Sequence, residues 1–284
     1  MSNLQLKTNY EDMARNAIES GVEYFRANAE LKSMVIGVSG GIDSALTAVI
    51  GRRVCDILGN VRLSGYFLPM SGNLEDERTR AVEIGSDVCH NFKTVPGLDK
   101  AFIDLLNIVD GPLYAKAIVT PGELTVEDKI RMGNIKARIR MIYLYNQARK
   151  LNGLVLSTDN YTEYNLGFWS LNGDVGNLGL IQELWKTEVY GIAESIGGPL
   201  GSSVEAKPTD GLGITNSDLD QLLPGWVGSY RDGYREVDNI LIDYLDGNKS
   251  YDPEHPVIKR HIATDFKRKD PVTIKRDLLV WSHN

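Results

Sequence analysis

Short apolar runs alternate with longer amphipathic stretches along the first half of the chain. The apolar runs are rich in branched residues and bounded by turn residues, which predicts buried strands at 34–38, 63–68, 91–95 and 154–157. Apolar side chains recur at helical spacing over about 9–29, 43–58, 73–88, 98–108 and 126–150. Strands that alternate with helices predict an α/β fold: an open parallel sheet with helices on both faces.

The second half is richer in turn residues. Helical spacing returns at about 186–196 and 232–246, whereas no structure is assigned to 109–124. Two segments, 200–225 and 255–284, are expected to be mobile without ligand and to cover a bound substrate. No linker divides the chain, so residues 1–284 are expected to form a single domain. Asn73 is expected to cap the helix that follows it.

Composition limits the kinds of molecule that the chain is expected to bind. The net charge of −7 over 284 residues leaves no basic excess to neutralise phosphates, so nucleic acid is not expected as a partner. The N-terminus has no signal pattern, and no apolar run approaches the length of a membrane span. Cys55 and Cys89 lack metal-ligand spacing and are expected to be reduced thiols, which favours a cytoplasmic location.

The first predicted strand runs into Ser39-Gly40-Gly41, and a helical pattern follows. Two glycines let backbone N–H groups turn inward, and a helix start directs further N–H groups to the same point, so residues 37–44 predict a phosphate-binding loop. Asp43 is placed to hold the Mg²⁺ that accompanies nucleotide phosphates. The alternative is an ordinary strand–turn–helix in which Asp43 or Ser44 serves only as a helix cap.

A second polar segment follows the fourth predicted strand, from Thr158 to Glu163. In open α/β sheets ligands bind at the carboxyl ends of the strands, near the point where the strand order reverses. The two segments are therefore expected to face one another.

Four motifs together resemble a known family. Ser39-Gly40-Gly41-Ile42-Asp43-Ser44 is similar to the SGGxDS loop of the ATP pyrophosphatases, whose fold is Rossmann-like, of the adenine nucleotide α-hydrolase type. Residues 133–141, with the sequence GNIKARIRM, resemble the GNxxARxRM helix of the NAD synthetases. Ser157-Thr158-Asp159 with Glu163, and Lys207-Pro208-Thr209-Asp210, resemble two further motifs of that family.

The resemblance implies an activity. NAD synthetases amidate deamido-NAD⁺ with ammonia through an adenylated carboxylate, consume ATP with Mg²⁺, release AMP and pyrophosphate, and are homodimers. No amidase region precedes the phosphate loop, so free ammonia, or ammonia from a separate partner, is expected to be the nitrogen source. Two alternatives remain: another ATP pyrophosphatase that amidates or thiolates a different acceptor, such as a GMP-synthetase-like enzyme, or a nucleotide-binding protein without turnover.

The resemblance also implies roles for single residues. It assigns Asp43 and Glu163 to the metal, Arg138, Asp174 and Lys267 to deamido-NAD⁺, and Asp174, Lys186 and Asp43 to catalysis. Its ATP-binding set comprises Gly37, Val38, Ser39, Gly40, Gly41, Ile42, Asp43, Ser44, Thr158, Lys186 and Thr209. Simpler explanations are a surface carboxylate for Glu163, a local ion pair for Arg138 and a turn-stabilising role for Asp174.

The chain departs from the family pattern at four substrate contacts. Leu171 replaces a usual lysine, Phe67 a usual arginine and Phe266 a usual histidine, and a second aspartate of the family has no clear counterpart around Asn177 and Leu178. These departures bear on the identity of the acceptor and leave the predicted ATP and metal site intact.

Overall fold

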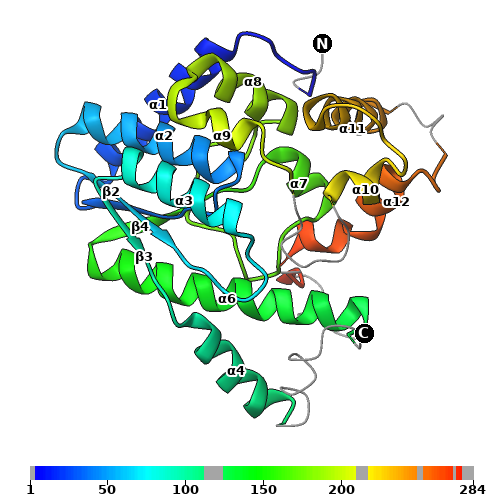
Figure 1. Cartoon of the computed structure of the whole chain (residues 1–284). Helices are drawn as coiled ribbons and strands as arrows, with labels where there is room; N and C mark the ends of the chain where they lie inside the picture. The colour runs from blue at the N-terminus through cyan, green and yellow to red at the C-terminus, as the bar shows by residue number, and fades with distance from the viewer. Residues whose placement is uncertain (1–3, 112–123, 209–216, 248–251, 271–272, 277–284) are drawn as a thin grey trace, which may run out of the picture.

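A parallel sheet of five strands organises the molecule, in the order β3-β2-β1-β4-β5. The computed structural model describes residues 4–111, 124–208, 217–247, 252–270 and 273–276 (Figure 1). The strands are β1 Ser33–Gly37, β2 Arg62–Phe67, β3 Asn91–Thr94, β4 Gly153–Ser157 and β5 Leu178–Gly179. The strand order reverses at β1, which pairs with β2 on one side and with β4 on the other.

Helices cover both faces of this sheet (Figure 1). On one face lie α1 Tyr10–Ala27, α2 Ile42–Leu58, α3 Glu75–Val88 and α8 Lys186–Ile196. On the other lie α6 Val126–Lys150, packed on β1 and β4, and α4 Leu98–Val109, packed on α6. The central strand serves both layers, because Met34 and Ile36 join the core on the α2 side while Val35 joins the core on the α6 side. The predicted fold class is confirmed.

The remaining helices lie in two groups (Figure 1). η1 Gly198–Leu200 and α9 Gly201–Val204 pack beside α2 and α8. The other group comprises α7 Tyr161–Leu166, α10 Asp218–Leu222, α11 Tyr230–Leu245, α12 Pro256–Ala263 and η2 Asp265–Lys269. α11 packs on α8, and α12 packs on both α11 and α7.

One local prediction was wrong. Asn73 does not cap α3, which begins at Glu75 after a turn at Gly72. Asn73 Oδ1 accepts from Met70 N (3.0 Å), while Leu74 N donates to Glu77 Oε2 (3.1 Å). Because the Asn73 side chain is used in the turn, the Glu77 carboxylate, one turn into the helix, accepts from the N–H of Leu74 instead.

Short elements were also missed. The sequence pattern predicted neither α7 nor β5, because a two-residue strand and a helix of under two turns leave little periodicity. Of the segment 109–124, residues 112–123 lie outside the described part of the chain.

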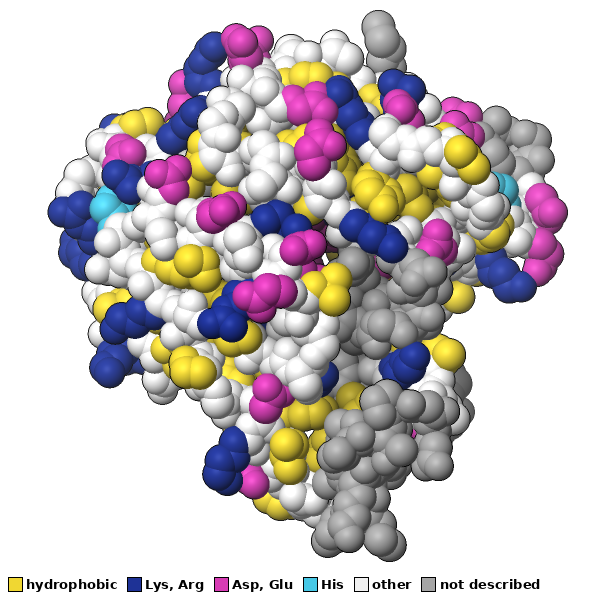
Figure 2. All heavy atoms as spheres, viewed as in Figure 1, with side chains coloured by type: hydrophobic (Ala, Val, Ile, Leu, Met, Phe, Trp, Pro, Cys, Tyr) yellow, Lys and Arg dark blue, Asp and Glu magenta, His cyan; other side chains and the backbone are white. Residues whose placement is uncertain are grey.

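The surface shows mixed charge. On the face seen in Figure 2 the described acidic and basic side chains are interspersed. Within the described ranges, no helix combines the length and apolar character that a membrane crossing requires.

We expect Ile36→Ala to lower the free energy of unfolding by about 2–4 kcal/mol, because Ile36 is fully buried in the central strand and its loss leaves a cavity. Urea denaturation at constant m-value measures this. Ile57→Ala is the control, since Ile57 on α2 is 56% exposed and should change stability by under about 1 kcal/mol. Equal losses in both variants would contradict the assignment of β1 to the core.

Candidate active site

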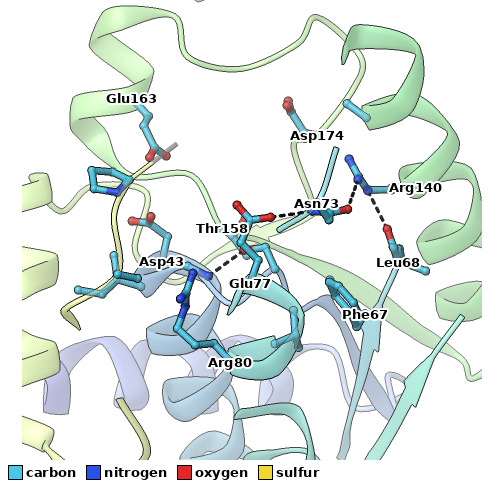
Figure 3. Close-up of a pocket in the computed structure, with 18 of the residues that line it drawn as sticks. Asp43, Phe67, Leu68, Asn73, Glu77, Arg80, Arg140, Thr158, Glu163 and Asp174 are labelled. Carbon is cyan, nitrogen blue, oxygen red and sulfur yellow. Dashed lines mark hydrogen bonds between the residues drawn. The ribbon is translucent and has the colours of Figure 1, made fainter. Parts of the chain in front are cut away.

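A cavity of about 380 Å³ opens at the carboxyl ends of β1 and β4, where the strand order reverses (Figure 3). The phosphate loop forms one wall. Tyr66, Phe67 and Leu68 at the end of β2 form another, and Thr158 and Glu163 after β4 a third. A volume of this size is typical of small-molecule sites. The two segments predicted to face one another therefore line the same cavity.

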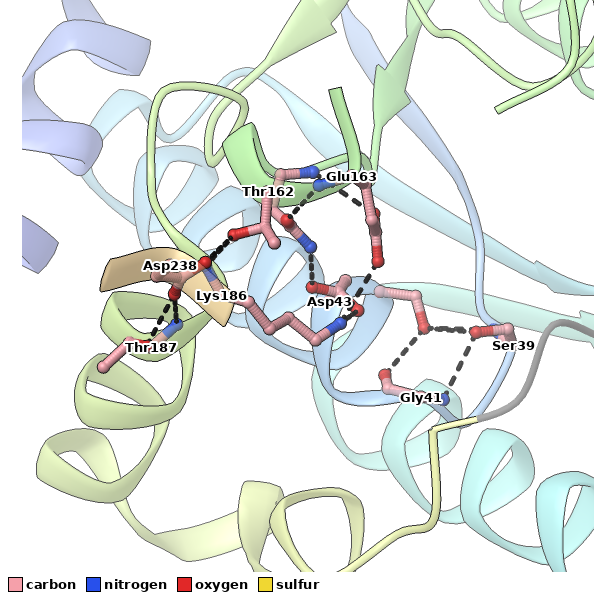
Figure 4. Close-up of polar contacts among 10 residues, drawn as sticks. Ser39, Gly41, Asp43, Thr162, Glu163, Lys186, Thr187 and Asp238 are labelled. Atoms are coloured by element: carbon pink, nitrogen blue, oxygen red, sulfur yellow. Dashed lines mark hydrogen bonds and ion pairs between the residues drawn. The ribbon is translucent and has the colours of Figure 1, made fainter. Parts of the chain in front are cut away.

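Hydroxyl groups hold the phosphate loop in shape (Figure 4). Ser44 Oγ donates to Gly41 O (3.1 Å) and accepts from Ser39 N (3.1 Å). Since the Ser44 proton is used, Ser39 Oγ donates to Ser44 Oγ (2.9 Å), and Ser39 Oγ in turn accepts from Gly41 N (3.2 Å). The N-cap of α2 is Gly41, which has no side chain to accept from the first N–H groups of the helix. These groups belong to residues that line the cavity. Such a helix start favours anions.

Gly40 is required for the turn. Its φ is +87°, and a Cβ there would lie 2.4 Å from Glu77 O on α3. Gly40 O accepts from Arg80 Nε (3.1 Å) and from Ser203 Oγ (3.3 Å). The loop is therefore clamped against α3 and α9 as well as against its own helix.

A buried lysine joins the two halves of the cavity. Lys186, the first residue of α8, is 3% exposed, and its Nζ donates to Asp43 Oδ2 and to Glu163 Oε1, the latter at 3.2 Å (Figure 4). Asp43 comes from α2 and Glu163 from α7. The simple surface-carboxylate explanation of Glu163 is thus excluded. Asp43 and Glu163 approach because β1 and β4 are neighbours, and α8 brings Lys186 to them by packing on both α2 and α7.

The charged groups around Lys186 shift one another's pKa values. Burial alone would lower the pKa of Lys186, but Asp43 and Glu163 together raise it well above its usual value. Burial raises the pKa of Glu163, and the Lys186 ammonium opposes that shift. The lysine is therefore an ammonium, held between two carboxyl groups in the same buried place.

The donor set fits Mg²⁺ bound together with a nucleotide. Among the described residues no three His, Cys, Asp or Glu side chains converge on one point. Mg²⁺ usually takes one or two carboxylates, with phosphate oxygens and waters as its other ligands. Asp43 and Glu163 supply two carboxylates that already converge on one cationic group.

Asn160 was missed by the sequence reasoning. It is fully buried; its Oδ1 accepts from Glu163 N (3.0 Å), and its Nδ2 donates to Asp43 Oδ1 (2.8 Å). Glu163 Oε2 reaches back to Asn160 N (3.4 Å), which completes a capping box at the start of α7. The spacing N-x-x-E was visible in the sequence and would have identified this helix start.

Asp174 lies on the loop between α7 and β5 and lines the same cavity. Its Oδ1 accepts from Ser170 N (2.9 Å). Burial raises its pKa, while the Ser170 hydrogen bond and the charges of Lys267 and Arg138 oppose the shift. A carboxylate that faces the cavity with a raised pKa is suited to accept a proton.

Arg138 and Lys267 lie outside this cavity. Arg138 is exposed, and its Nη2 donates to Leu171 O (2.8 Å), so it supports the loop that carries Asp174. Lys267 Nζ donates to the carbonyls of Gly167 (2.6 Å) and Trp169 (2.5 Å) and lines a neighbouring cavity that also contains Asp159. Their contact with deamido-NAD⁺ stays a prediction.

The structure collects most of the predicted site residues around the first cavity. Those that line it are Gly37, Val38, Ser39, Gly41, Ile42, Asp43, Thr158, Glu163, Asp174 and Lys186. Gly40 and Ser44 act behind the wall, through the clamp and the hydroxyl network. Thr209 lies outside the described residues.

Two cations of the cavity wall were missed. Arg80 on α3 lines the cavity beside the phosphate loop, and Arg140 on α6 lines it from the opposite helical layer (Figure 3). Arg140 Nε donates to Leu68 O (3.0 Å) at the end of β2. Arg140 belongs to the GNIKARIRM motif at 133–141. Its place in that motif, two residues after Arg138, was the one sequence feature that pointed to a role in the site.

Comparisons with known proteins agree on one family. Residues 14–270 match the NAD synthase model. The chain is 31% identical over 264 residues to the NH3-dependent NAD⁺ synthetase of Thermoplasma volcanium, covering 92% of this chain and 97% of that protein. It is 32% identical over 258 residues to the NH3-dependent NAD⁺ synthetase of Picrophilus torridus, covering 90% and 92%.

Solved structures share the fold. The NAD⁺ synthetase of Burkholderia pseudomallei superposes with a TM-score of 0.65 at 27% identity, covering 95% of this chain and 93% of that chain. An NMN synthetase from Francisella tularensis superposes with a TM-score of 0.73 at 23% identity, covering 95% and 100%, and this likeness concerns the fold alone.

Asp159 should make stability depend on pH. Burial raises its pKa to about 7, although the hydrogen bond from Ser157 (2.7 Å) opposes the shift. Because the folded pKa exceeds the unfolded one, near 3.9, the stabilising contribution is complete below pH 4 and is lost as pH rises to 7. When the pH is lowered from 7 to 4, the free energy of unfolding of wild type should therefore increase by up to about 4 kcal/mol relative to that of Asp159→Asn. This is about 1.4 kcal/mol for each of three pH units.

Urea denaturation at four pH values measures that difference. Asp104→Asn, an exposed carboxylate of α4, is the control and should parallel wild type. Parallel curves for Asp159→Asn and wild type would refute the assignment.

Proposed function

Because this chain belongs to the NAD synthase family, we propose that it amidates deamido-NAD⁺ to NAD⁺ with ammonia and ATP, releasing AMP and pyrophosphate. One observation carries the proposal beyond family membership. The phosphate loop, Asp43, Glu163 and Lys186 meet in one cavity at the strand-order reversal. That arrangement supplies N–H donors, a buried cation and two metal-binding carboxylates for a polyphosphate.

In the first step the chain holds and polarises ATP. The phosphate loop receives the β- and γ-phosphates, and the Lys186 ammonium offsets their charge. A carboxylate oxygen of deamido-NAD⁺ attacks the α-phosphorus; the bond to the bridging oxygen breaks, and pyrophosphate leaves. Cations and fixed N–H groups stabilise the charge that develops on the phosphoryl oxygens. Thr158 and, by resemblance, Thr209 contact ATP.

Asp43 and Glu163 would hold Mg²⁺. The ion supplies charge neutralisation at the phosphates when it is bound. Asn160 orients both carboxylates, because it donates to Asp43 and caps the helix that carries Glu163. Binding of the ion with ATP requires Lys186 to share its carboxylate partners.

In the second step ammonia replaces AMP. Asp174 accepts one proton from ammonium, and the freed lone pair attacks the carbonyl carbon of the adenylate. The carbon–oxygen bond to AMP then breaks with its electron pair on the phosphate, and the nitrogen releases a second proton to solvent to leave the neutral amide. The raised pKa of Asp174 supports this role, since a buried carboxylate holds a proton more readily than an exposed one. Arg138 and Lys267 border the loop of Asp174 and would contact the dinucleotide there.

The acceptor is the least constrained part of the proposal. Phe67 lines the cavity wall and is 2% exposed, Phe266 is 57% exposed, and Leu171 offers only its backbone carbonyl to Arg138. These side chains provide no charge for a second phosphate group. Nicotinic acid mononucleotide is therefore the competing acceptor within the same chemistry, and a GMP-synthetase-like acceptor is a more distant one.

Further features complete the proposal. Residues 1–284 act as one cytoplasmic domain; the described cysteines, Cys55 and Cys89, are free and buried, which is consistent with a reducing compartment.

Segments 200–225 and 255–284 move over the substrates. In the described part of these segments, α12 and η2 already pack against α7, where Arg260 Nε donates to Leu166 O (2.9 Å).

Homodimerisation is supported by α6, a long helix that leaves the large aliphatic side chain of Ile142 70% exposed. A second copy of this chain would cover Ile142 by packing its own α6 against this one.

The activity assay supplies ATP, Mg²⁺, ammonium and deamido-NAD⁺ and measures NAD⁺, AMP and pyrophosphate, with nicotinic acid mononucleotide in a parallel reaction. Asp43→Asn and Glu163→Gln should each lower kcat by about 100-fold or more, because the metal and Lys186 lose a charged partner. Asp56→Asn, an exposed carboxylate of α2, is the control. ADP as product, or no turnover by wild type, would refute the proposal; preference for the mononucleotide would revise the acceptor.

Sedimentation velocity tests the dimer. Wild type should sediment as a dimer at micromolar concentration, and Ile142→Glu should shift it to monomer by placing a charge in the apolar contact. Ile57→Glu introduces the same charge on α2 at a site of similar exposure, 56%, and should stay dimeric. A wild-type monomer, or dissociation by both variants, would reject this surface as the interface.

A further inference from the structure

A buried aspartate on α11 connects the two short helices that carry Glu163 and Lys186. Asp238 is fully buried, and its carboxylate accepts three hydrogen bonds (Figure 4). Thr162 Oγ1 donates to Oδ1 (2.6 Å), while Thr187 N (2.9 Å) and Thr187 Oγ1 (2.6 Å) donate to Oδ2. Each threonine is the sequence neighbour of a predicted site residue: Thr162 precedes Glu163, and Thr187 follows Lys186.

The same network caps α8 from outside its own sequence. The N-cap residue of α8 is Trp185, and it makes no side-chain cap hydrogen bond. Lys186 N instead donates to Thr162 Oγ1 (2.7 Å), and Thr187 N donates to Asp238. The first N–H groups of a helix need such acceptors, and a carboxylate there is also favoured by the helix dipole. The direction of α8, and so the start of the Lys186 side chain, is fixed by α7 and α11.

A packing role alone does not explain an aspartate here. Burying a carboxylate costs several kcal/mol before its hydrogen bonds offset the loss. The neighbouring buried residues Tyr234, Val237 and Leu241 show that this face of α11 is otherwise apolar or aromatic. Burial raises the pKa of Asp238 to about 6, and the hydrogen bonds from Thr162 and Thr187 oppose the shift, so the group is ionised at neutral pH.

α11 makes a second contact with the same lysine. Tyr234, one helical turn before Asp238, places its ring 5.5 Å from Lys186 Nζ. The ring restricts the far end of the lysine side chain while Asp238 fixes the backbone at its base. Both ends of Lys186 are thus governed by one helix that contributes no predicted ligand of ATP or of the metal.

We propose that Asp238 is a positioning residue, which holds Glu163 and Lys186 in register through the hydroxyls of Thr162 and Thr187. This inference rests on the proposed function for its kinetic consequence. Asp238 itself touches no substrate. Displacing α8 against α7 by even about 1 Å would separate the ammonium from its carboxylates, and misplacement of that size costs about 100-fold in rate.

Paired substitutions at Thr162 test the link. Thr162→Val removes the hydroxyl that joins Asp238 to Lys186 N at nearly constant volume, whereas Thr162→Ser retains it. Thr162→Val and Asp238→Asn should lower kcat about 10- to 100-fold, with the KM for deamido-NAD⁺ changed less than threefold. Thr162→Ser should stay within about threefold of wild type, because it keeps the same hydrogen bonds. Glu236→Gln, an exposed carboxylate on α11, is the matched control.

A binding measurement separates this inference from the proposed activity. Mn²⁺ affinity, followed by electron paramagnetic resonance with a non-hydrolysable ATP analogue, should weaken at least about fivefold in Thr162→Val and Asp238→Asn and stay unchanged in Thr162→Ser. All measurements are made well below each variant's melting temperature. If wild type turns over but Thr162→Val matches it in both kcat and Mn²⁺ affinity, the positioning role is overturned. If wild type makes no NAD⁺, the function fails while the Mn²⁺ comparison still decides the role of Asp238.

Discussion

The ammonium of Lys186, buried between Asp43 and Glu163, is the interaction on which the site depends. A buried ammonium is stable only when its partners are fixed, so the elements that carry them cannot drift apart. The lysine therefore ties α8 to α2 and α7, and through them to the carboxyl ends of β1 and β4. The sheet topology makes this possible, because the pairing of β1 with β4 brings the starts of α2 and α7 together, and α8 packs on both of these helices.

The same interaction explains how Mg²⁺ would be held without a dedicated cage. Asp43 and Glu163 already converge on one cationic group, and Asn160 adds an amide hydrogen bond to Asp43. A divalent ion bound together with nucleotide phosphates would share these carboxyl groups and balance the charge of the phosphate oxygens. The lysine thus keeps the two carboxyl groups in the positions that such an ion would need.

Much of this could be predicted from the sequence, and the rest could not for identifiable reasons. The strands, the long helices and the convergence of Asp43 with Glu163 follow from periodicity and from the rule for open sheets. Asp238 was missed because its partners, Thr162 and Thr187, lie 76 and 51 residues away and leave no local pattern. Its one sequence signal was an acidic residue on the apolar face of α11. Lys267 was predicted to contact deamido-NAD⁺; its donation to two backbone carbonyls after α7 is a further contact that composition cannot reveal.

The two halves of the site are held by different means, and this bears on the departures from the family pattern. Side chains fix the ATP half: Ser39 and Ser44 shape the loop, and Lys186 locks its rim. The acceptor half is held largely through backbone atoms, since Arg138 grips Leu171 by its carbonyl oxygen and Asp174 is held by Ser170 N. A loop anchored by its backbone tolerates a change of side chain at position 171 without moving Asp174. Replacement of a lysine by Leu171 can therefore alter which carboxylate binds while the chemistry at ATP and the position of the proton acceptor stay the same.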